Sequence, residues 1–477
     1  MSAPFHDDAP LGSHPGPASA PAPADDLLAA HQAEAAPASS PVSSWYALGV
    51  ILAVAVYAVM DRQIFTLLNE PVRTELGLSD TQMGVLQGAG LALLSVATTY
   101  PISWLADRFD RRVVLAGCIT VWSLAVVLSG LAPTFTWLLV GASVVGIGEG
   151  GIPPTAQAML PDLFPAGRLQ LANSVFVIGA RLCSSLGVLL AGYLIGLAGF
   201  MRAYMPSGLA TLSDWRLAFL AAALFLPVAL VLVLSMPRRA SGMASRSKPG
   251  GASPALPLAP FLRRYAVPQF SVFLGVAVAT FGFLSIDVWV PVAAARYFGQ
   301  TPQQGGEWLA VIGLAAVVVG FAAGTPVIRW LETRFGARTP LVALAWLLFG
   351  CVPLSVGIGF ATSLVFLYGA LAAQMTLLMV MNMVYPTMLQ RMSPQHVRAR
   401  IFALVTIFTL IAQSLSPLAV GAVSDALGTA ARPLLTAMML VSIASCCVSG
   451  AIFWLTTRPY GRMVDEVARD DTTEARA

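Results

Sequence analysis

The sequence predicts an all-α membrane protein with twelve transmembrane helices arranged as two six-helix bundles. Three observations support this fold class. The 477-residue chain is 57% hydrophobic and 10% charged, with a mean hydropathy of +0.77, whereas about a quarter of the residues in soluble domains are charged. Twelve apolar stretches are long enough to cross a bilayer, and a basic loop occurs once in each half of the chain.

Each predicted span approaches the roughly 20 apolar residues that a membrane helix needs. The spans begin near Trp45, Thr81, Val113, Trp137, Leu171, Leu217, Phe270, Trp308, Leu341, Leu364, Ile401 and Leu434. A segment rich in Gly, Pro, Ser and Arg separates the first six from the last six and indicates a domain boundary. We expect a disordered cytoplasmic tail at 1–44, bundles at 45–236 and 265–457, a cytoplasmic linker at 237–264, and a cytoplasmic tail at 458–477.

The distribution of basic residues predicts the orientation. If the N-terminus is cytoplasmic, most of the 27 Lys and Arg residues lie on the cytoplasmic side. The loops on the other side contain Arg73, Arg202, Arg216, Arg296 and Arg432. By the positive-inside rule, both termini are therefore cytoplasmic. We expect a multi-pass protein of the bacterial inner membrane.

The basic loop is an internal repeat. Trp104, Leu105, Arg108, Phe109 and Arg112 recur as Trp330, Leu331, Arg334, Phe335 and Arg338, at one constant spacing and after the second span of each half. Such self-similarity indicates two related bundles. Two related bundles around a central site are an architecture in which secondary transporters alternate between inward-open and outward-open states.

The first copy of this loop resembles a family signature. Residues 103–112 read Ser-Trp-Leu-Ala-Asp-Arg-Phe-Asp-Arg-Arg, similar to the Gly-x-x-x-Asp-Arg-x-Gly-Arg-Arg loop of the major facilitator superfamily, with Ser and Asp in place of the two glycines. Asp107 can face a helix N-terminus in the other half, where an anion is favoured. Arg108, Arg111 and Arg112 can face carboxylates and lipid headgroups. We interpret the four as a cytoplasmic gate; the alternative is that the arginines only fix topology.

Four charged residues lie inside predicted spans of the first half: Asp61, Arg62, Glu149 and Arg181. A charge at this depth costs at least ~2.5 kcal/mol, so it is expected to be paired or to face a water-filled cavity. We interpret the four as a proton-coupling network, with static salt bridges as the alternative. The histidines lie outside the apolar stretches, so buried proton chemistry would use carboxylates.

A narrower resemblance is to the spinster-type branch of the superfamily. It rests on Asp61-Arg62-Gln63-Ile64, Glu70-Pro71, the linker from Glu75 to Gln82, and the run from Gly148 to Pro154 that continues to Pro165. It is close from Tyr57 to about Gly192 and looser in the second half. In that branch, membrane-embedded acids of spans one and four are implicated in proton coupling, and some animal members export lysolipids or sphingoid phosphates. The resemblance implies coupling roles for Asp61, Arg62 and Glu149.

One departure from that branch leads to a hypothesis about Arg181. Relatives carry an arginine in span four seven residues before the glutamate, where this chain has Ala142, and a proline at the position of Arg181. The arginine has in effect moved to the neighbouring helix. We therefore hypothesise that Arg181 is the counter-ion of Glu149.

Further polar residues within the spans are candidates for a substrate cavity. They are Tyr57 in span one, Asp287 in span seven, Asn382 in span ten and Gln413 in span eleven. Asp287 also lies within about two turns of Arg296, and an interfacial ion pair between these two is favoured over a cavity role. For the amides, hydrogen bonds between helices are favoured over contacts with a solute.

Together these features predict a secondary active transporter that is proton-coupled and moves an amphipathic or lysolipid-like solute through the lipid membrane. The alternatives are a proton-coupled organic-anion or sugar-acid symporter and a non-transporting receptor. The chain has no Gly-x-x-x-x-Gly-Lys-Ser/Thr loop for ATP. It also has no paired nucleophile and base, so we expect no enzyme activity. We expect no cofactor, no metal and no nucleic-acid partner, and a monomeric protein.

Overall fold

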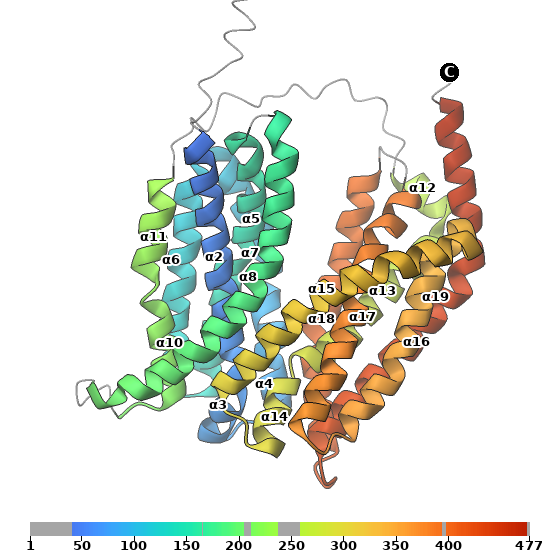
Figure 1. Ribbon diagram of the computed structural model, residues 1–477. Helices are drawn as coiled ribbons and strands as arrows, with labels where there is room; N and C mark the ends of the chain where they lie inside the picture. Colours follow the sequence, from blue (N-terminus) through green and yellow to red (C-terminus); the bar gives the residue numbers. More distant parts are fainter. Residues whose placement is uncertain (1–40, 165, 205–210, 237–257, 394–396, 475–477) are drawn as a thin grey trace, which may run out of the picture.

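A computed structural model describes residues 41–164, 166–204, 211–236, 258–393 and 397–474, and these residues form helices and connecting turns without any strand. The helices stand in two groups side by side (Figure 1), one from the first half of the chain and one from the second. We call the end at which α2 begins and α19 finishes the terminal face. The opposite end, where α3 and α14 lie, is the distal face.

The first half crosses between the two faces six times. Four crossings are single helices: α2 (Pro41–Leu67), α6 (Arg111–Gly130), α7 (Phe135–Leu163) and α8 (Ala166–Met201). The second crossing combines α4 (Asp80–Val85), the π-helical turn η1 (Leu86–Gly90) and α5 (Leu91–Arg108). The sixth combines α10 (Asp214–Ala223) and α11 (Leu226–Ser235). The distal face adds α3 (Asn69–Leu76) and the short turn η2 (Arg202–Tyr204).

The second half repeats this order. After α12 (Leu258–Arg264), the seventh crossing is α13 (Ala266–Asp287), which continues into α14 (Val290–Phe298) at the distal face. The remaining crossings are α15 (Pro302–Phe335), α16 (Thr339–Gly359), α17 (Leu364–Arg391), α18 (Arg398–Ala426) and α19 (Pro433–Glu474), with the turn η3 (Gly336–Arg338) between α15 and α16.

The all-α, twelve-helix prediction is confirmed. Within the described residues, ten helices are long and apolar enough to span a membrane, and Phe135–Gly148 is a shorter apolar helix. The chain between α3 and α6 supplies one more crossing, broken by η1. The expected starts lie close to the observed ones, with the largest offset at the eighth span, expected near Trp308 and observed from Pro302. The expected tail and linker fall mostly on residues outside the described ranges.

The two halves use the same local signals at the distal face. Both α3 and α14 end at a glycine with positive φ, Gly77 at 62° and Gly299 at 65°, a conformation that glycine adopts without steric cost. Two residues later a capping box opens the next crossing, through Ser79 and Gln82 in one half and Thr301 and Gln304 in the other. The turns that redirect the chain are therefore encoded locally.

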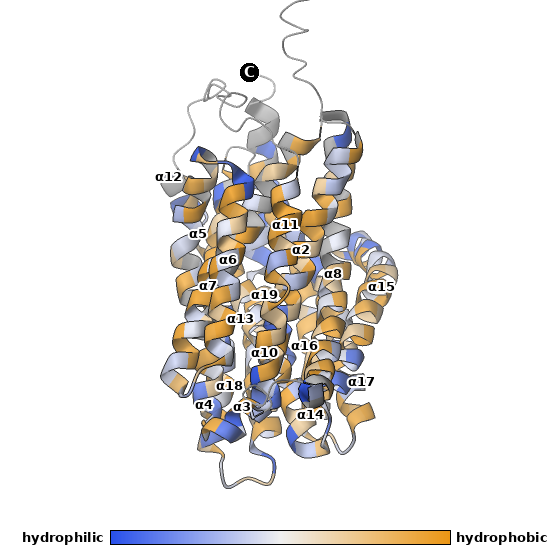
Figure 2. Cartoon of the chain, turned by 90° about the vertical axis from the view of Figure 1, so that its left-hand side faces the viewer, coloured by the Kyte–Doolittle hydropathy of each residue, from blue (hydrophilic) through white to orange (hydrophobic). Residues whose placement is uncertain are grey.

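The outer surface suits a lipid environment. Large apolar side chains such as Val231, Val318, Val365 and Leu455 are exposed on the outside of the helices, an exposure that soluble monomers rarely show over large areas. Figure 2 shows hydrophobic residues along the length of the helices and hydrophilic ones gathered toward the two ends. This banding agrees with helices that cross a bilayer.

The halves pack against each other through α4, η1 and α5 against α18, and through α8 against α15. Glycines permit the close approach. A Cβ on Gly84 or Gly88 would collide with the backbone of α18, and a Cβ on Gly192 would lie 3.0 Å from the Gln303 carbonyl oxygen. These contacts lie in the distal part of the helices. The buried core of the first half is likewise continuous with distal residues of the second half, such as Trp289.

Candidate functional site

A cavity of about 590 Å³ lies between α8 and the second half. Its volume is within the range of small-molecule sites. Ser184 and Ser185 of α8 line one side. The other walls come from α13, α15, α16, α17, α18 and α19, and their polar lining residues are Thr280, Asp287, Gln374, Asn382, Tyr385, Thr406, Thr409 and Gln413. The cavity therefore lies at an interface between the two halves.

The cavity is on the terminal side of the contacts that join the halves. Along α8, Ser184 and Ser185 come before Gly192, which packs against α15 near the distal face. Along α18, Gln413 comes before Pro417, which packs against Gly84 and Gly88. Because both helices run from the terminal face to the distal face, packing separates the cavity from the distal face.

Three of the four expected cavity residues line this space: Asp287, Asn382 and Gln413. Tyr57 is elsewhere, because its hydroxyl donates to the Ala222 carbonyl oxygen at 3.1 Å and lies 3.2 Å from Ser123 Oγ. Its ring also packs on Trp122. Tyr57 thus belongs to the packed interior of the first half rather than to the cavity.

Asp61 is buried in the first half, with 2% of its surface exposed. The indole Nε1 of Trp122 on α6 donates to Asp61 Oδ2 at 2.7 Å. Gly148 on α7 packs so closely on Trp122 that a Cβ there would collide with the tryptophan. Trp122 therefore joins the helix of Asp61 to the helix of Glu149. Arg62, the next residue on α2, is exposed.

The side chains of Asp107, Glu149 and Arg181 lie outside the described part of the structure. The pairing of Glu149 with Arg181 and the contacts of Asp107 therefore stay predictions. The backbone places Arg181 on α8, one turn before the cavity residue Ser185.

Two arginines of the expected cytoplasmic gate, Arg108 and Arg112, make contacts within their own half. Arg112 forms an ion pair with Asp110 at 2.6 Å and donates to the Met236 carbonyl oxygen at 2.6 Å. The guanidinium of Arg108 lies 4.0 Å from the centre of the Trp104 ring. In the second half, Arg391 pairs with Glu332 at 2.8 Å.

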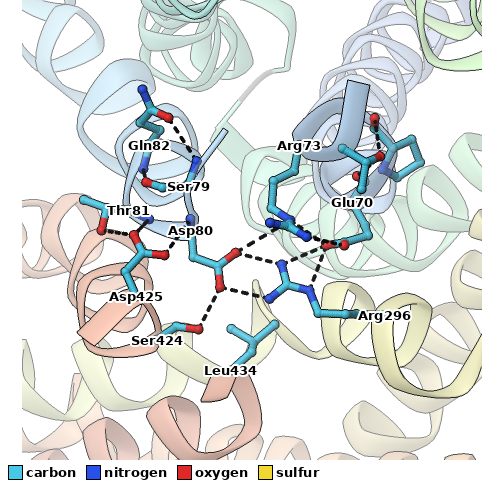
Figure 3. A network of polar contacts seen from close by, with 12 residues as sticks. Glu70, Arg73, Ser79, Asp80, Thr81, Gln82, Arg296, Ser424, Asp425 and Leu434 are labelled. Carbon is cyan, nitrogen blue, oxygen red and sulfur yellow. Dashed lines mark hydrogen bonds and ion pairs between the residues drawn. The ribbon is translucent and has the colours of Figure 1, made fainter. Parts of the chain in front are cut away.

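The distal face is different, because charged residues there tie the halves together (Figure 3). Arg296 on α14 donates to Glu70 Oε2 at 3.0 and 2.8 Å and to the two carboxylate oxygens of Asp80 at 2.9 and 2.7 Å. Arg73 adds a 2.9 Å ion pair to Glu70 and a longer one to Asp80. One arginine of the second half thus bridges two acids of the first.

Helix α18 contributes a second set of distal contacts. Ser424 Oγ donates to Asp80 Oδ2 at 2.7 Å. The Asp425 carboxylate accepts the backbone N–H groups of Asp80 and Thr81 at 3.1 and 2.8 Å, at the beginning of α4. A carboxylate is favoured at a helix N-terminus. We call this cluster the distal latch; it consists of Glu70, Arg73, Asp80, Arg296, Ser424 and Asp425.

The latch favours ionised acids. Burial alone would raise the pKa of Glu70, but hydrogen bonds from Arg73 and Arg296 outweigh it, and the pKa of Glu70 is lowered from its ordinary value of 4.5. The exposed fractions of the Glu70 and Arg296 side chains are both 15%. Both charged groups are thus largely buried, and each is stabilised by its ion pair with the other.

The latch corrects one expectation and supplies residues that the sequence did not reveal. Arg296 pairs with Glu70 and Asp80 rather than with Asp287, because α14 turns it toward α3 and α4 at the distal face. The available signal was the placement of Arg73, Arg296, Glu70 and Asp80 in loops on the same predicted side of the membrane.

The fold and the cavity together define a membrane transport protein built from two homologous bundles, with an interfacial cavity that is separated from one face. Residues 50–417 match the family model described as Major Facilitator Superfamily. The chain belongs to this superfamily, as expected.

The relatives include the spinster proteins anticipated from the sequence. The chain is 27% identical over 442 residues to an MFS-type efflux pump of Mycolicibacterium smegmatis, covering 90% of this chain and 96% of the relative. It is 25% identical over 409 residues to the sphingosine-1-phosphate transporter SPNS2 of Xenopus tropicalis, covering 80% and 73%. These relatives are transporters rather than enzymes.

A solved structure shares the fold. It is a bacterial homologue of the human lysosomal transporter Spinster, in an inward-facing and unoccupied conformation. The TM-score is 0.71 at 22% identity, over 91% of this chain and 99% of that one.

Proposed function

We propose that this chain is a proton-coupled secondary transporter that moves an amphipathic or lysolipid-like solute by alternating access. The observation that carries the proposal is the asymmetry of the contacts between the halves. The distal latch and the glycine contacts hold the halves together at one face, and the cavity lies on the other side of these contacts. A carrier needs this arrangement in one of its two end states.

The composition of the cavity supports an amphipathic solute. Apolar residues such as Phe283, Met375 and Met379 form much of the wall, and Gln374, Asn382 and Gln413 add amides. Methionine side chains adapt to apolar groups of varied shape. The sphingosine-1-phosphate transporter among the relatives supports the same solute class.

For coupling, we propose that protonation of Asp61 or Glu149 changes the balance between the two end states, with Arg62 and Arg181 as counter-ions. The burial of Asp61 and its bond to Trp122 support this role, because Trp122 connects α2, α6 and α7. A change of charge at Asp61 would therefore act on three helices of the first half.

The terminal face is proposed to be cytoplasmic, in the inner membrane of a bacterium, with the chain acting as a monomer composed of bundles at 45–236 and 265–457. Arg108, Arg111, Arg112, Arg334 and Arg338 lie toward this face, which supports the assignment through the positive-inside rule. In that orientation the state described is inward-open, and Asp107 with its neighbouring arginines forms the gate that closes in the opposite state.

The proposal is tested by transport in liposomes. The purified protein is reconstituted, a pH gradient is imposed, and the accumulation of a fluorescent lysophosphatidylcholine is followed. We expect accumulation that depends on the gradient and is abolished by Asp61→Asn or Glu149→Gln, while exchange without a gradient continues. Asp465→Asn, which changes an exposed acid on α19, is the matched control. Accumulation that is equal with and without the gradient would contradict proton coupling.

A further inference from the structure

Asp287 sets the charge of the cavity. It is the only described lining residue with a formal charge. Within the described part of the chain, its carboxylate makes no hydrogen bond and no ion pair. Arg296, the basic residue that follows it along the chain, is engaged by Glu70 and Asp80. A carboxylate at this depth is costly unless a positive group compensates it.

Gln374 adds a second polar group that has no hydrogen-bond partner among the described residues. Its side chain is 2% exposed and lines the cavity. Both its Nε2 and Oε1 are buried without a hydrogen bond to any described residue. A buried amide with neither donor nor acceptor satisfied is destabilising, and Gln374 lines the same cavity as Asp287. The two residues come from different helices, α17 and α13, so they converge on one region.

Next to this polar region the wall is apolar. Phe283, Met375, Met379 and Phe453 line it, and the volume of about 590 Å³ is much larger than a bare metal ion needs. A small inorganic cation requires a cage of oxygen ligands, whereas the part of the wall formed by Phe283, Met375 and Met379 is apolar. An anion would add a second negative charge beside Asp287.

We infer that the cavity selects an amphipathic organic cation, whose positive group pairs with Asp287 and bonds to Gln374 while its apolar part packs on the methionine and phenylalanine wall. This inference rests on the proposed function, because it takes the cavity to be the place where a carrier holds its cargo. It narrows the solute class to molecules with a positively charged polar end. It also disfavours the organic-anion symporter.

Arg181 is the residue that would reverse this selectivity. It lies one turn from Ser185 on α8, and we propose Glu149 as its partner. If Arg181 instead faced the cavity as its dominant charge, the cavity would prefer anions. The charge of the preferred ligand therefore distinguishes an Arg181 that pairs with Glu149 from an Arg181 that faces the cavity.

The test compares two probes of the same shape and opposite charge, tetraphenylphosphonium and tetraphenylborate. Binding is measured to the full chain in lipid nanodiscs without any gradient, and empty nanodiscs give the background. We expect the cation to bind at least about tenfold more tightly than the anion, a difference of about 1.4 kcal/mol. Asp287→Asn is expected to remove at least about tenfold of cation affinity, whereas Asp287→Glu keeps most of it. Asp465→Asn, a charge-matched change far from the cavity, leaves it unchanged.

Each other outcome overturns the inference. These outcomes are equal or tighter binding of the anion, unchanged cation binding in Asp287→Asn, and equal competition by sodium ions. Gel filtration and thermal melting establish that Asp287→Asn is folded. Binding is measured without a gradient, so a failure of cation binding does not contradict gradient-driven accumulation of the lysolipid. Conversely, cation binding without any gradient-driven transport would contradict the proposed function and leave this inference standing.

Discussion

At the scale of single residues, the contact between Asp61 and Trp122 organises the interior of the first half. Trp122 is fully buried, and its indole N–H donates to the Asp61 carboxylate at 2.7 Å. A buried carboxylate that loses a donor pays its desolvation cost without that compensation. The bond therefore contributes both to stability and to the position of the proposed proton site.

A double-mutant cycle measures this contribution. Trp122→Phe removes the donor and keeps most of the aromatic packing, and we expect it to destabilise the protein by about 1–3 kcal/mol. In the Asp61→Asn background the same change is expected to cost less, because a neutral amide needs the bond less. Thermal unfolding of the unsubstituted chain, the two single variants and the double variant in one detergent gives the coupling free energy between Trp122 and Asp61. Equal costs in the two backgrounds would show that the tryptophan acts through packing alone.

Glu70 of the distal latch is expected to keep its charge when the pH changes near neutrality. The lowered pKa of Glu70 means that its ionised form stabilises the latched state. That stabilisation is complete above the ordinary value of 4.5 and is lost as pH falls through the lowered value. Between about pH 8 and about pH 6, Glu70 therefore stays charged in both states, and it is not the coupling site.

This prediction can be checked with spin labels at the exposed distal residues Thr74 and Thr429, in a chain whose native cysteines are replaced. In the combined Asp61→Asn and Glu149→Gln variant, we expect the distance between the labels to be the same at about pH 8 and about pH 6. In the chain that keeps both acids, the distance distribution responds to pH. A pH response that survives in the combined variant would place the sensor elsewhere.

At the scale of helices, glycines determine how closely the halves approach. Gly88→Ala would place a methyl group against the backbone of Ser414 and the ring of Pro417. Because these atoms belong to the other half, the clash arises only when the distal face is closed. We expect Gly88→Ala to fold and to lengthen the distance between labels at Thr74 and Thr429.

Gly117→Ala on α6 is the matched control, since no atom lies within 4 Å of the added Cβ. It is expected to leave the distance unchanged and to alter stability by less than about 1 kcal/mol. A distance in Gly88→Ala equal to that of the unsubstituted chain would mean that α18 yields without opening.

The helices also show what sequence reasoning can reach. Apolar length, Gly77, Gly299 and the two capping boxes are local signals, so the spans and their turns could be predicted. The candidates Asp287, Asn382 and Gln413 stand out in the sequence because polar residues within apolar spans are rare, and all three line the cavity. The partners of Arg296 could not be found in this way, since Glu70 and Asp80 lie 226 and 216 residues earlier and only the packing of α14 on α3 and α4 selects them.

At the scale of the whole molecule, the two halves have different tasks. The proposed proton site with Asp61 and Trp122 is inside the first half, while most of the cavity wall, including Asp287 and Gln374, belongs to the second. The distal latch connects them through Arg296. A change at Asp61 can therefore reach Asp287 and Gln374 by altering the contacts between the halves, as alternating access requires.

The most direct test of this account measures both faces at once in Arg296→Ala. Labels at Thr74 and Thr429 report on the distal face, and labels at the exposed residues Val113 and Gln390 report on the terminal face. Loss of Arg296 removes the ion pairs between the second half and the acids Glu70 and Asp80, at a cost of about 3 kcal/mol to the latched state. Arg432→Ala, whose guanidinium bonds to Ala361 within the second half, is the control.

Distances between the spin labels are measured by double electron–electron resonance. In Arg296→Ala they are expected to lengthen at the distal face and to shorten at the terminal face, and neither change is expected in Arg432→Ala. Such a reciprocal change is the signature of two bundles that rock about a central cavity. A distal distance that lengthens while the terminal distance stays constant would contradict the account, because the latch would then be a local clasp and not part of a transport cycle.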